Sequence, residues 1–117
     1  MDLREKILQA KDLKNKKITV PEWAVDVYIK AFTGADRVVF QEKISPLIEK
    51  KTMADSMAAM IHLLLIAIVD KDGKQIFTES DFESLNNKSN AVLERLTKEA
   101  LSINGLDAKA ESDAEKN

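Results

Sequence analysis

Cysteine is absent from the 117-residue sequence, and glycine, proline and aromatic residues are scarce. Without cysteine there is no disulfide, no zinc–thiolate site and no cysteine nucleophile, and a reducing cytoplasm is the simplest location to expect. Three glycines are too few for a glycine-rich loop that cradles phosphate. Since aromatic residues make up only 5% of the chain, aliphatic side chains must fill its core.

Long apolar runs and a strong net charge are missing as well. The longest apolar stretch, residues 57–69, falls short of the about 20 residues that span a bilayer, and it predicts a buried helix. The formal net charge is −2, and the lysine cluster in residues 11–17 has neither arginine nor a neighbouring aromatic for stacking. We therefore expect no membrane partner and no nucleic-acid partner.

The composition that remains is that of a globular protein, with 44% hydrophobic and 32% charged residues. The length predicts a single globular domain, which we place at residues 1–105. Beyond Leu106 the sequence has no large apolar residue. Residues 106–117 are therefore predicted to form a disordered C-terminal tail.

Alternation of apolar and polar residues predicts a β-hairpin at about residues 18–31. Ile18 and Val20 flank a polar residue, and residues 25–30 continue with a β-branched residue at every other position. Pro21 cannot donate to a strand ladder, so the first strand is expected at a sheet edge, with the turn at residues 22–24.

The remainder of the chain predicts helices, which gives an α+β fold that is predominantly α-helical, with a small N-terminal β-hairpin packed with about four to five helices. Thr33 and Thr78 are each followed three residues later by an aspartate, an arrangement that starts helices. Pro46 should kink its helix or end it early, and Asn104-Gly105 should end the last helix. After a short amphipathic helix at 2–12, the apolar spacing predicts helices at about 34–50, 53–69, 79–86 and 89–103.

Residues 70–82 raise the question of a calcium loop, because they combine three aspartates, a glycine and a glutamate. With Gly73 at the sixth position of an EF-hand loop, the first position is Ile68, which offers no oxygen ligand. With Asp70 at the first position, Lys74 takes the place of a ligand. Asp-Lys-Asp-Gly is instead good turn chemistry, so we expect a turn and no metal site.

The reactive side chains give no catalytic, cofactor or metal site. The single histidine, His62, lies in the apolar helix with no acid three or four residues away to orient it. Glu79, Asp81 and Glu83 fall in a first helical turn, where the helix dipole favours negative charge in any case. The serines lack the context of a nucleophile elbow. The sequence therefore predicts that the protein is not an enzyme.

One face of the helix at 53–69 is a candidate partner-binding surface. Met53, Met57 and Met60 lie at positions i, i+4 and i+7 and so share a face, while the opposite side of the helix is also apolar. Burial of both sides within the domain is the simpler explanation. The alternative is contact with another protein, because methionine suits surfaces that adapt to changing partners.

Val20 and Trp23 form a second candidate at the hairpin. An exposed strand edge near Val20 would allow a partner to add a strand, and Trp23 would anchor that contact. The simpler explanation of Trp23 is a lid over the small core.

Several short motifs follow one another in a defined order along residues 1–106. They are Val-Pro-Glu-Trp (20–23), Thr-Gly-Ala-Asp-Arg (33–37), Val-Asp-Lys-Asp-Gly-Lys-Gln-Ile-Phe (69–77), Ser-Asp-Phe-Glu-Ser-Leu (80–85), Lys-Ser-Asn-Ala-Val-Leu-Glu-Arg-Leu (88–96) and Asn-Gly-Leu (104–106). In this order and spacing the chain resembles the tail assembly chaperones of long, non-contractile-tailed (siphovirus-type) bacteriophages.

The resemblance implies a non-catalytic assembly factor of the host-cell cytoplasm that is absent from the mature virion. Its implied partners are the phage tape-measure protein, the tail-tube protein, further copies of itself in a homo-oligomer, and a longer form of itself made by programmed frameshifting. Residues 115–117 could be encoded by an adenine run of the slippery kind. The resemblance assigns a role to no individual residue.

Other functions stay open on the sequence alone. A minor structural component of the phage tail, or another small protein-binding module, is the principal alternative. A small enzyme or a calcium sensor is a further possibility, after the chaperone and this alternative.

Overall fold

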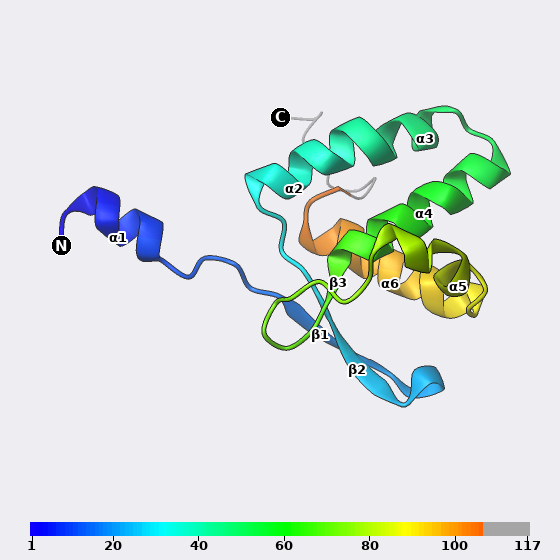
Figure 1. Ribbon diagram of the computed structural model, residues 1–117, viewed down its shortest axis with the longest axis horizontal. Coiled ribbons are helices and arrows are strands. Elements are labelled where there is room, and N and C mark those ends of the chain that lie inside the picture. Colours follow the sequence, from blue (N-terminus) through cyan, green and yellow to red (C-terminus); the bar gives the residue numbers. More distant parts are fainter. Residues whose placement is uncertain (107–117) are drawn as a thin grey trace.

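The computed structural model describes residues 1–106 and confirms an α+β fold that is predominantly α-helical (Figure 1). Single 3₁₀ turns lie at Pro21–Trp23 and Glu79–Asp81, and a π turn lies at Phe40–Ile44. In chain order the other elements are α1 (Leu3–Gln9), β1 (Lys16–Val20), β2 (Val25–Ile29), α2 (Gly34–Val39), α3 (Ser45–Glu49), α4 (Met53–Ala67), β3 (Ile68–Val69), α5 (Phe82–Asn86) and α6 (Asn90–Ile103).

The predicted hairpin is present and runs from Lys16 to Ile29. β1 pairs with β2 in antiparallel register along its whole length. The 3₁₀ turn connects the strands, and Ala24 reverses the chain with a left-handed backbone, at φ 55°. The strand order β1-β2-β3 places β1 at an edge of the described sheet, which confirms the position that Pro21 predicted.

Strand β3 corrects the prediction of a helix over residues 53–69. α4 ends at Ala67, and the next two residues pair antiparallel with the end of β2. A short apolar run occurs both in buried helices and in buried strands, so its residue pattern does not distinguish the two. The backbone groups of β2 need hydrogen-bond partners, and pairing with residues 68 and 69 supplies them.

Helix starts follow the predicted capping chemistry. Thr33 Oγ1 accepts a hydrogen bond from the Asp36 amide at 3.1 Å, and Asp36 Oδ2 accepts one from the Thr33 amide at 2.9 Å. At the second start, Asp81 Oδ2 accepts a hydrogen bond from the Thr78 amide at 2.9 Å, and the Asp81 amide donates to the Thr78 carbonyl at 2.9 Å. Burial raises the pKa of Asp36, but hydrogen bonds from Lys30, 2.9 Å away, and from Thr33 outweigh it and lower the pKa overall.

The segment that resembled a calcium loop is a turn, as predicted. Asp70 Oδ1 accepts hydrogen bonds from the amides of Asp72 at 2.8 Å and Lys74 at 2.9 Å. Gly73 has φ +83°, a left-handed conformation that suits glycine. The Lys74 amide bond, helped by the others in the turn, holds the pKa of Asp70 below its ordinary value. The carboxylate is therefore engaged by its own loop.

The predicted end of the last helix is confirmed at Asn104-Gly105. Gly105 adopts φ +67°, and the amides of Gly105 and Leu106 donate to the carbonyls of Ser102 and Leu101, the two hydrogen bonds of a Schellman motif. The Asn104 side chain also reaches across the fold. It accepts from the Phe32 amide at 2.7 Å and donates to the Lys30 carbonyl at 3.0 Å. The cap thus joins α6 to the segment between β2 and α2.

Pro46 does not end its helix, which changes to π geometry just before it. In the π turn the Ser45 amide bonds to the Phe40 carbonyl, five residues earlier. In a regular α-helix the proline ring clashes with the carbonyl four residues earlier, and a wider turn relieves that clash. α2 and α3 consequently follow one another as a nearly continuous rod (Figure 1).

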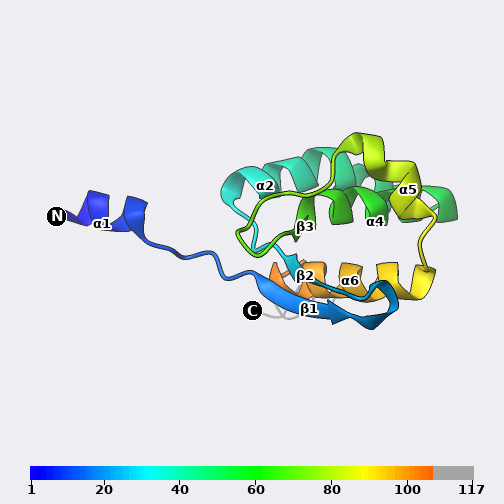
Figure 2. The same ribbon diagram turned by 60° about the horizontal axis from the view of Figure 1, so that its bottom comes forward.

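The core surrounds α4. α2, α4 and α5 lie in one layer, with α6 and the β1–β2 hairpin in a second layer (Figure 2). In the second half of α4, residues 61–67, every side chain except His62 and Ile66 is buried. Leu64 of α4 and Leu96 of α6 are fully inaccessible. None of the helices within residues 1–106 combines the length and the apolar character needed to cross a bilayer.

Helix α1 stands apart from this packed body in both views (Figures 1 and 2). It buries none of its residues. Residues 10–15 connect it to β1 without regular secondary structure. The packed body therefore consists of residues 16–106, and Leu106 lies partly buried against the core. The rest of the predicted C-terminal tail, from residue 107 on, lies outside the described residues.

Replacing Asp36 with Asn should reduce stability at neutral pH and have less effect in acid. The variant keeps an acceptor for the Thr33 amide but loses the ion pair with Lys30. A carboxyl with a lowered folded-state pKa stabilises the fold above its ordinary pKa of 3.8, and this stability is lost as the pH falls through the folded-state value. We expect Asp36→Asn to lower the free energy of unfolding by about 1 kcal/mol near pH 7. Urea unfolding there and at about pH 2 measures the difference, and an equal loss at both pH values would contradict the role of the charge.

Candidate partner-binding site

An apolar groove of about 370 Å³ opens between the α2–α3 rod, α4 and α6. We call it the methionine groove, because α4 contributes all three methionines of the predicted face. Glu94 is the one charged residue among those that line it. The lining residues are Phe40, Ile44, Ile48, Met53, Ser56, Met57, Ala59, Met60, Leu63, Glu94, Thr97 and Leu101.

The groove exists because the covering of α4 is incomplete at its N-terminal half. Met53 is 81% exposed, and Met57 and Met60 are half-buried. Ile48, on the opposite wall, is 48% exposed. Apolar side chains from two elements therefore face an opening. The sequence correctly placed the three methionines on one face, and the structure leaves that face partly open.

Val20 ends β1, the edge strand of the described sheet, where the sequence predicted an edge open to strand addition. Its side chain is fully buried in the core, so a partner at this strand edge would reach only its backbone. The alternation that identified the strand also points Val20 inward, and the choice of face depended on where the helices pack. Trp23 is half-buried and packs against the core beside Phe77 and Leu85, as the lid explanation requires.

Two ion pairs hold the hairpin against α6. Arg95 donates two hydrogen bonds to the Glu22 carboxylate, at 2.9 and 3.0 Å. Lys16 Nζ lies 2.6 Å from Glu99 Oε2. The hydrogen bonds from Arg95 lower the pKa of Glu22 and, reciprocally, raise the pKa of Arg95. Arg95 and Glu99 share one side of α6, and the groove lies on another.

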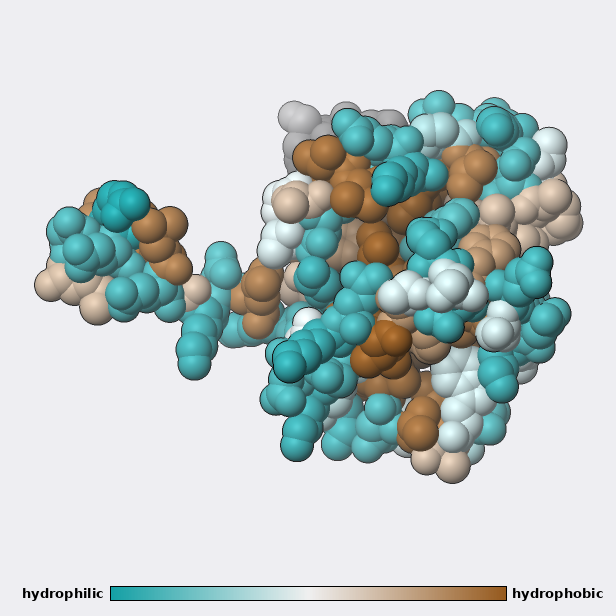
Figure 3. Space-filling model, in the orientation of Figure 1, coloured by the Kyte–Doolittle hydropathy of each residue, from teal (hydrophilic) through white to brown (hydrophobic). Residues whose placement is uncertain are grey.

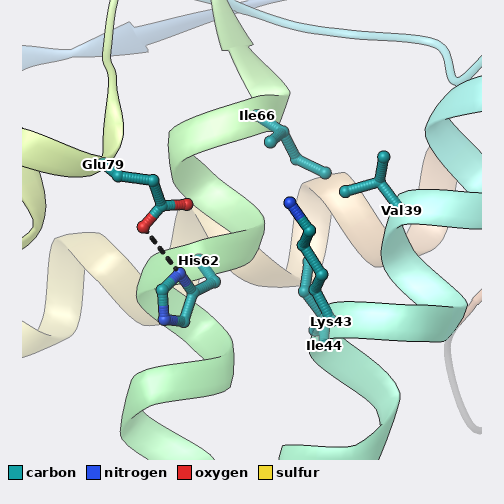
Figure 4. A pocket seen from close by; sticks show the side chains of 6 residues that line it. All are labelled: Val39, Lys43, Ile44, His62, Ile66 and Glu79. Carbon is teal, nitrogen blue, oxygen red and sulfur yellow. Dashed lines mark ion pairs between the residues drawn. The ribbon is translucent and has the colours of Figure 1, made fainter.

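His62 has an acid partner that the sequence did not predict. Its Nδ1 lies 3.2 Å from Glu79 Oε2 (Figure 4). Its ring centroid is 4.8 Å from that of Phe82. Sequence spacing could identify only acids three or four residues away on the same helix, and Glu79 belongs to the separate turn before α5. The pair borders a hollow of about 280 Å³ that Lys43 also lines.

The hollow beside His62 combines charged and apolar side chains. Lys43 and Glu79 line it together with the apolar Val39, Ile44 and Ile66. Glu79 is 70% exposed, and the pair is a surface contact between α4 and the turn before α5. Within residues 1–106, no three His, Asp or Glu side chains are grouped so as to hold a metal ion.

The fold is that of a small α+β domain in which helices surround one central apolar helix. A family model described as phage tail assembly chaperone matches residues 2–117, and the chain belongs to this family. This confirms the family that the order of motifs predicted. A search of curated proteins found no match.

A solved structure shares the fold. The structure of the bacteriophage HK97 tail assembly chaperone superimposes with a TM-score of 0.62 at 24% sequence identity. The superposition covers 86% of this chain and 95% of that one. At this level of identity the likeness establishes the arrangement of elements.

Truncation of Val20 and of Met53 should have very different effects on stability. Val20 is fully buried, so Val20→Ala removes apolar contacts and leaves a cavity that costs about 2 kcal/mol. Met53 is mostly exposed, so Met53→Ala should change stability by about 0.5 kcal/mol or less. Urea unfolding measures both, and a larger cost at Met53 would show that the groove is closed in solution.

Proposed function

We propose that this protein is a non-catalytic chaperone that binds the tape-measure protein and the tail-tube protein of a long, non-contractile-tailed phage during tail assembly. On this proposal it acts in the host-cell cytoplasm, alongside a frameshifted longer form of itself, and leaves before the virion is complete. Membership of the tail assembly chaperone family supports the general role. The methionine groove is the observation that supports a direct role in binding.

The dimensions of the groove suit an apolar helix face. From Met53 to Leu63 it follows α4 for about 15 Å, which corresponds to nearly three helical turns. A helix docked there would present large apolar side chains at positions i, i+3 or i+4, and i+7. A tape-measure segment with an apolar stripe, before it is packed inside a tail, has this character.

The chemistry of the groove favours adaptable binding over selective binding. Most of its lining is aliphatic or aromatic, and polar side chains enter only at Ser56, Glu94 and Thr97. Few hydrogen bonds are available to select one sequence, while flexible methionines adjust to differently shaped apolar surfaces. A contact of this small size binds weakly, which allows the client to leave as the tail is completed.

Charged substitutions in the groove should abolish retention of a client. We expect Met53→Glu and Met57→Glu each to reduce capture of a tape-measure fragment by about tenfold, because a carboxylate would have to be buried without a partner. The measurement is a pull-down of the fragment by the immobilised full-length protein, calibrated by fluorescence titration.

Ile76→Glu is the matched control. Ile76 is also an exposed apolar residue, at 49%, but it does not line the groove. This variant should capture the fragment as the wild type does. Urea midpoints for all three variants would show that they are folded. If the groove variants and the control retain the fragment equally, client binding does not use the groove.

Finished particles should lack the protein. A chaperone departs before completion, whereas a minor structural component remains in the tail. Quantitative mass spectrometry of purified virions, with the tail-tube protein as the internal reference, distinguishes these functions. A constant number of copies per particle would support the structural component instead.

A further inference from the structure

The arm helix α1 carries an apolar face with nothing packed on it. Leu3, Ile7 and Leu8 are 73%, 62% and 66% exposed, and apolar atoms are visible along the arm in the space-filling view (Figure 3). Leu3 and Ile7 are one turn apart and therefore neighbours on the helix surface. A seven-residue helix is marginal in water by itself, so α1 needs a surface to pack against.

We propose that α1 of one copy docks into the methionine groove of a second copy. Both surfaces are apolar and open. α1 is about 10 Å long, and the groove follows α4 for about 15 Å, so the helix fits within it. The inference stands on the arm and the groove alone and does not depend on the identity of any client.

The charges beside the two surfaces are complementary. Arg4 lies next to Leu3, Ile7 and Leu8 on the arm. The one charged residue that lines the groove is Glu94, which is an acid. A docked α1 brings a guanidinium to the side of the groove that carries a carboxylate, and the pairing favours one orientation of the arm.

The position of the arm favours a neighbour's groove over its own. Two residues of α6, Arg95 and Glu99, contact the hairpin. Three others, Glu94, Thr97 and Leu101, line the groove. With about 100° of rotation per residue, the two sets face directions about 150° apart around the helix axis. β1 therefore leaves the body on the far side of α6. Residues 10–15 span about 20 Å when extended, and to fold back they would have to pass around a helix about 10 Å wide.

The C-terminal residues are unsuited to the groove by composition. From residue 107 to 117 the largest apolar side chain is alanine, and six of the eleven positions are aspartate, glutamate or lysine with further polar residues between them. Such a segment offers no large side chain to insert among the methionines. The arm supplies the large aliphatic residues that it lacks.

Docking of this kind has a consequence for assembly. Each copy gives an arm and receives one, so the contacts either close as a reciprocal pair or continue head-to-tail into a ring or an open helical filament. An occupied groove is not available to a client, so the arm and an apolar client helix compete. A client would have to displace the arm before it could bind.

Disulfide trapping tests the docking directly, because the natural chain has no cysteine. We expect Ile7→Cys protein mixed with Met57→Cys protein to form a mixed disulfide dimer on mild oxidation. Replacing Met57→Cys with Val25→Cys, at an exposed hairpin position, should lower the yield by about tenfold. Non-reducing electrophoresis, with each protein carrying a different mass tag, measures the yield.

Three outcomes would overturn the proposal. An Ile7→Cys/Met57→Cys double variant that cross-links only within a single chain would show that the arm fills its own groove. Homodimers linked through Ile7→Cys alone, in place of mixed dimers, would show that arms pair with arms. Equal yields with Met57→Cys and Val25→Cys would show that collision alone brings the thiols together.

A charge swap provides an independent test. Arg4→Glu and Glu94→Lys should each weaken self-association about tenfold, and the double variant should recover most of the loss. Light scattering over a concentration series measures the association. Both residues are exposed, so folding should be unaffected. If the double variant associates no better than the single variants, the proposed orientation is wrong, and if Ile7→Asp also leaves association unchanged, the proposal fails. If the wild-type protein fails to capture the tape-measure fragment while the mixed disulfides still form, the proposed function is contradicted and the docking of α1 is not.

Discussion

Every layer of this fold depends on covering α4, a 15-residue helix with apolar side chains on nearly all sides. The α2–α3 rod, α5 and α6 pack against its length, and the sheet closes the end from which β3 continues. In water its apolar surface is the main driving force for this assembly. Over residues 61–67 the covering leaves only His62 and Ile66 partly exposed, whereas it is incomplete over the N-terminal half of α4, where the methionine groove opens.

Polar contacts fix where the covering elements lie more than they stabilise the fold. Glu22 and Arg95 are both well exposed, and exposed ion pairs contribute little to the free energy of unfolding. They nevertheless hold the hairpin on one side of α6. Asn104 does the same at the other end, where its amide bonds to the segment before α2. The hairpin therefore lies on a side of α6 away from the groove residues Glu94, Thr97 and Leu101.

The arm helix α1 and the methionine groove are both exposed apolar surfaces, and one contact between them would cover both. A protein that offers an apolar surface to unfinished partners risks nonspecific association through that surface. On our proposal, α1 of a neighbour covers the groove until a client replaces it. The exposed aliphatic residues of the arm and the methionines of the groove are then protected by the same contact, and the chain needs no further element to keep either covered.

Features set by neighbours in the chain could be predicted from the sequence. Examples are the reciprocal hydrogen bonds of Thr33 and Asp36, the turn at Gly73 and the helix end at Asn104-Gly105. Each is formed by groups a few residues apart, so it follows from local side-chain chemistry and backbone preference. The tertiary structure alone decided that residues 68 and 69 pair with β2, that Val20 faces the core and that Glu79 meets His62. It also decided that the methionine face stays open. Each of these outcomes depends on which remote segment packs alongside. The hydrophobic effect is non-directional, so an apolar sequence does not specify the segment that will cover it.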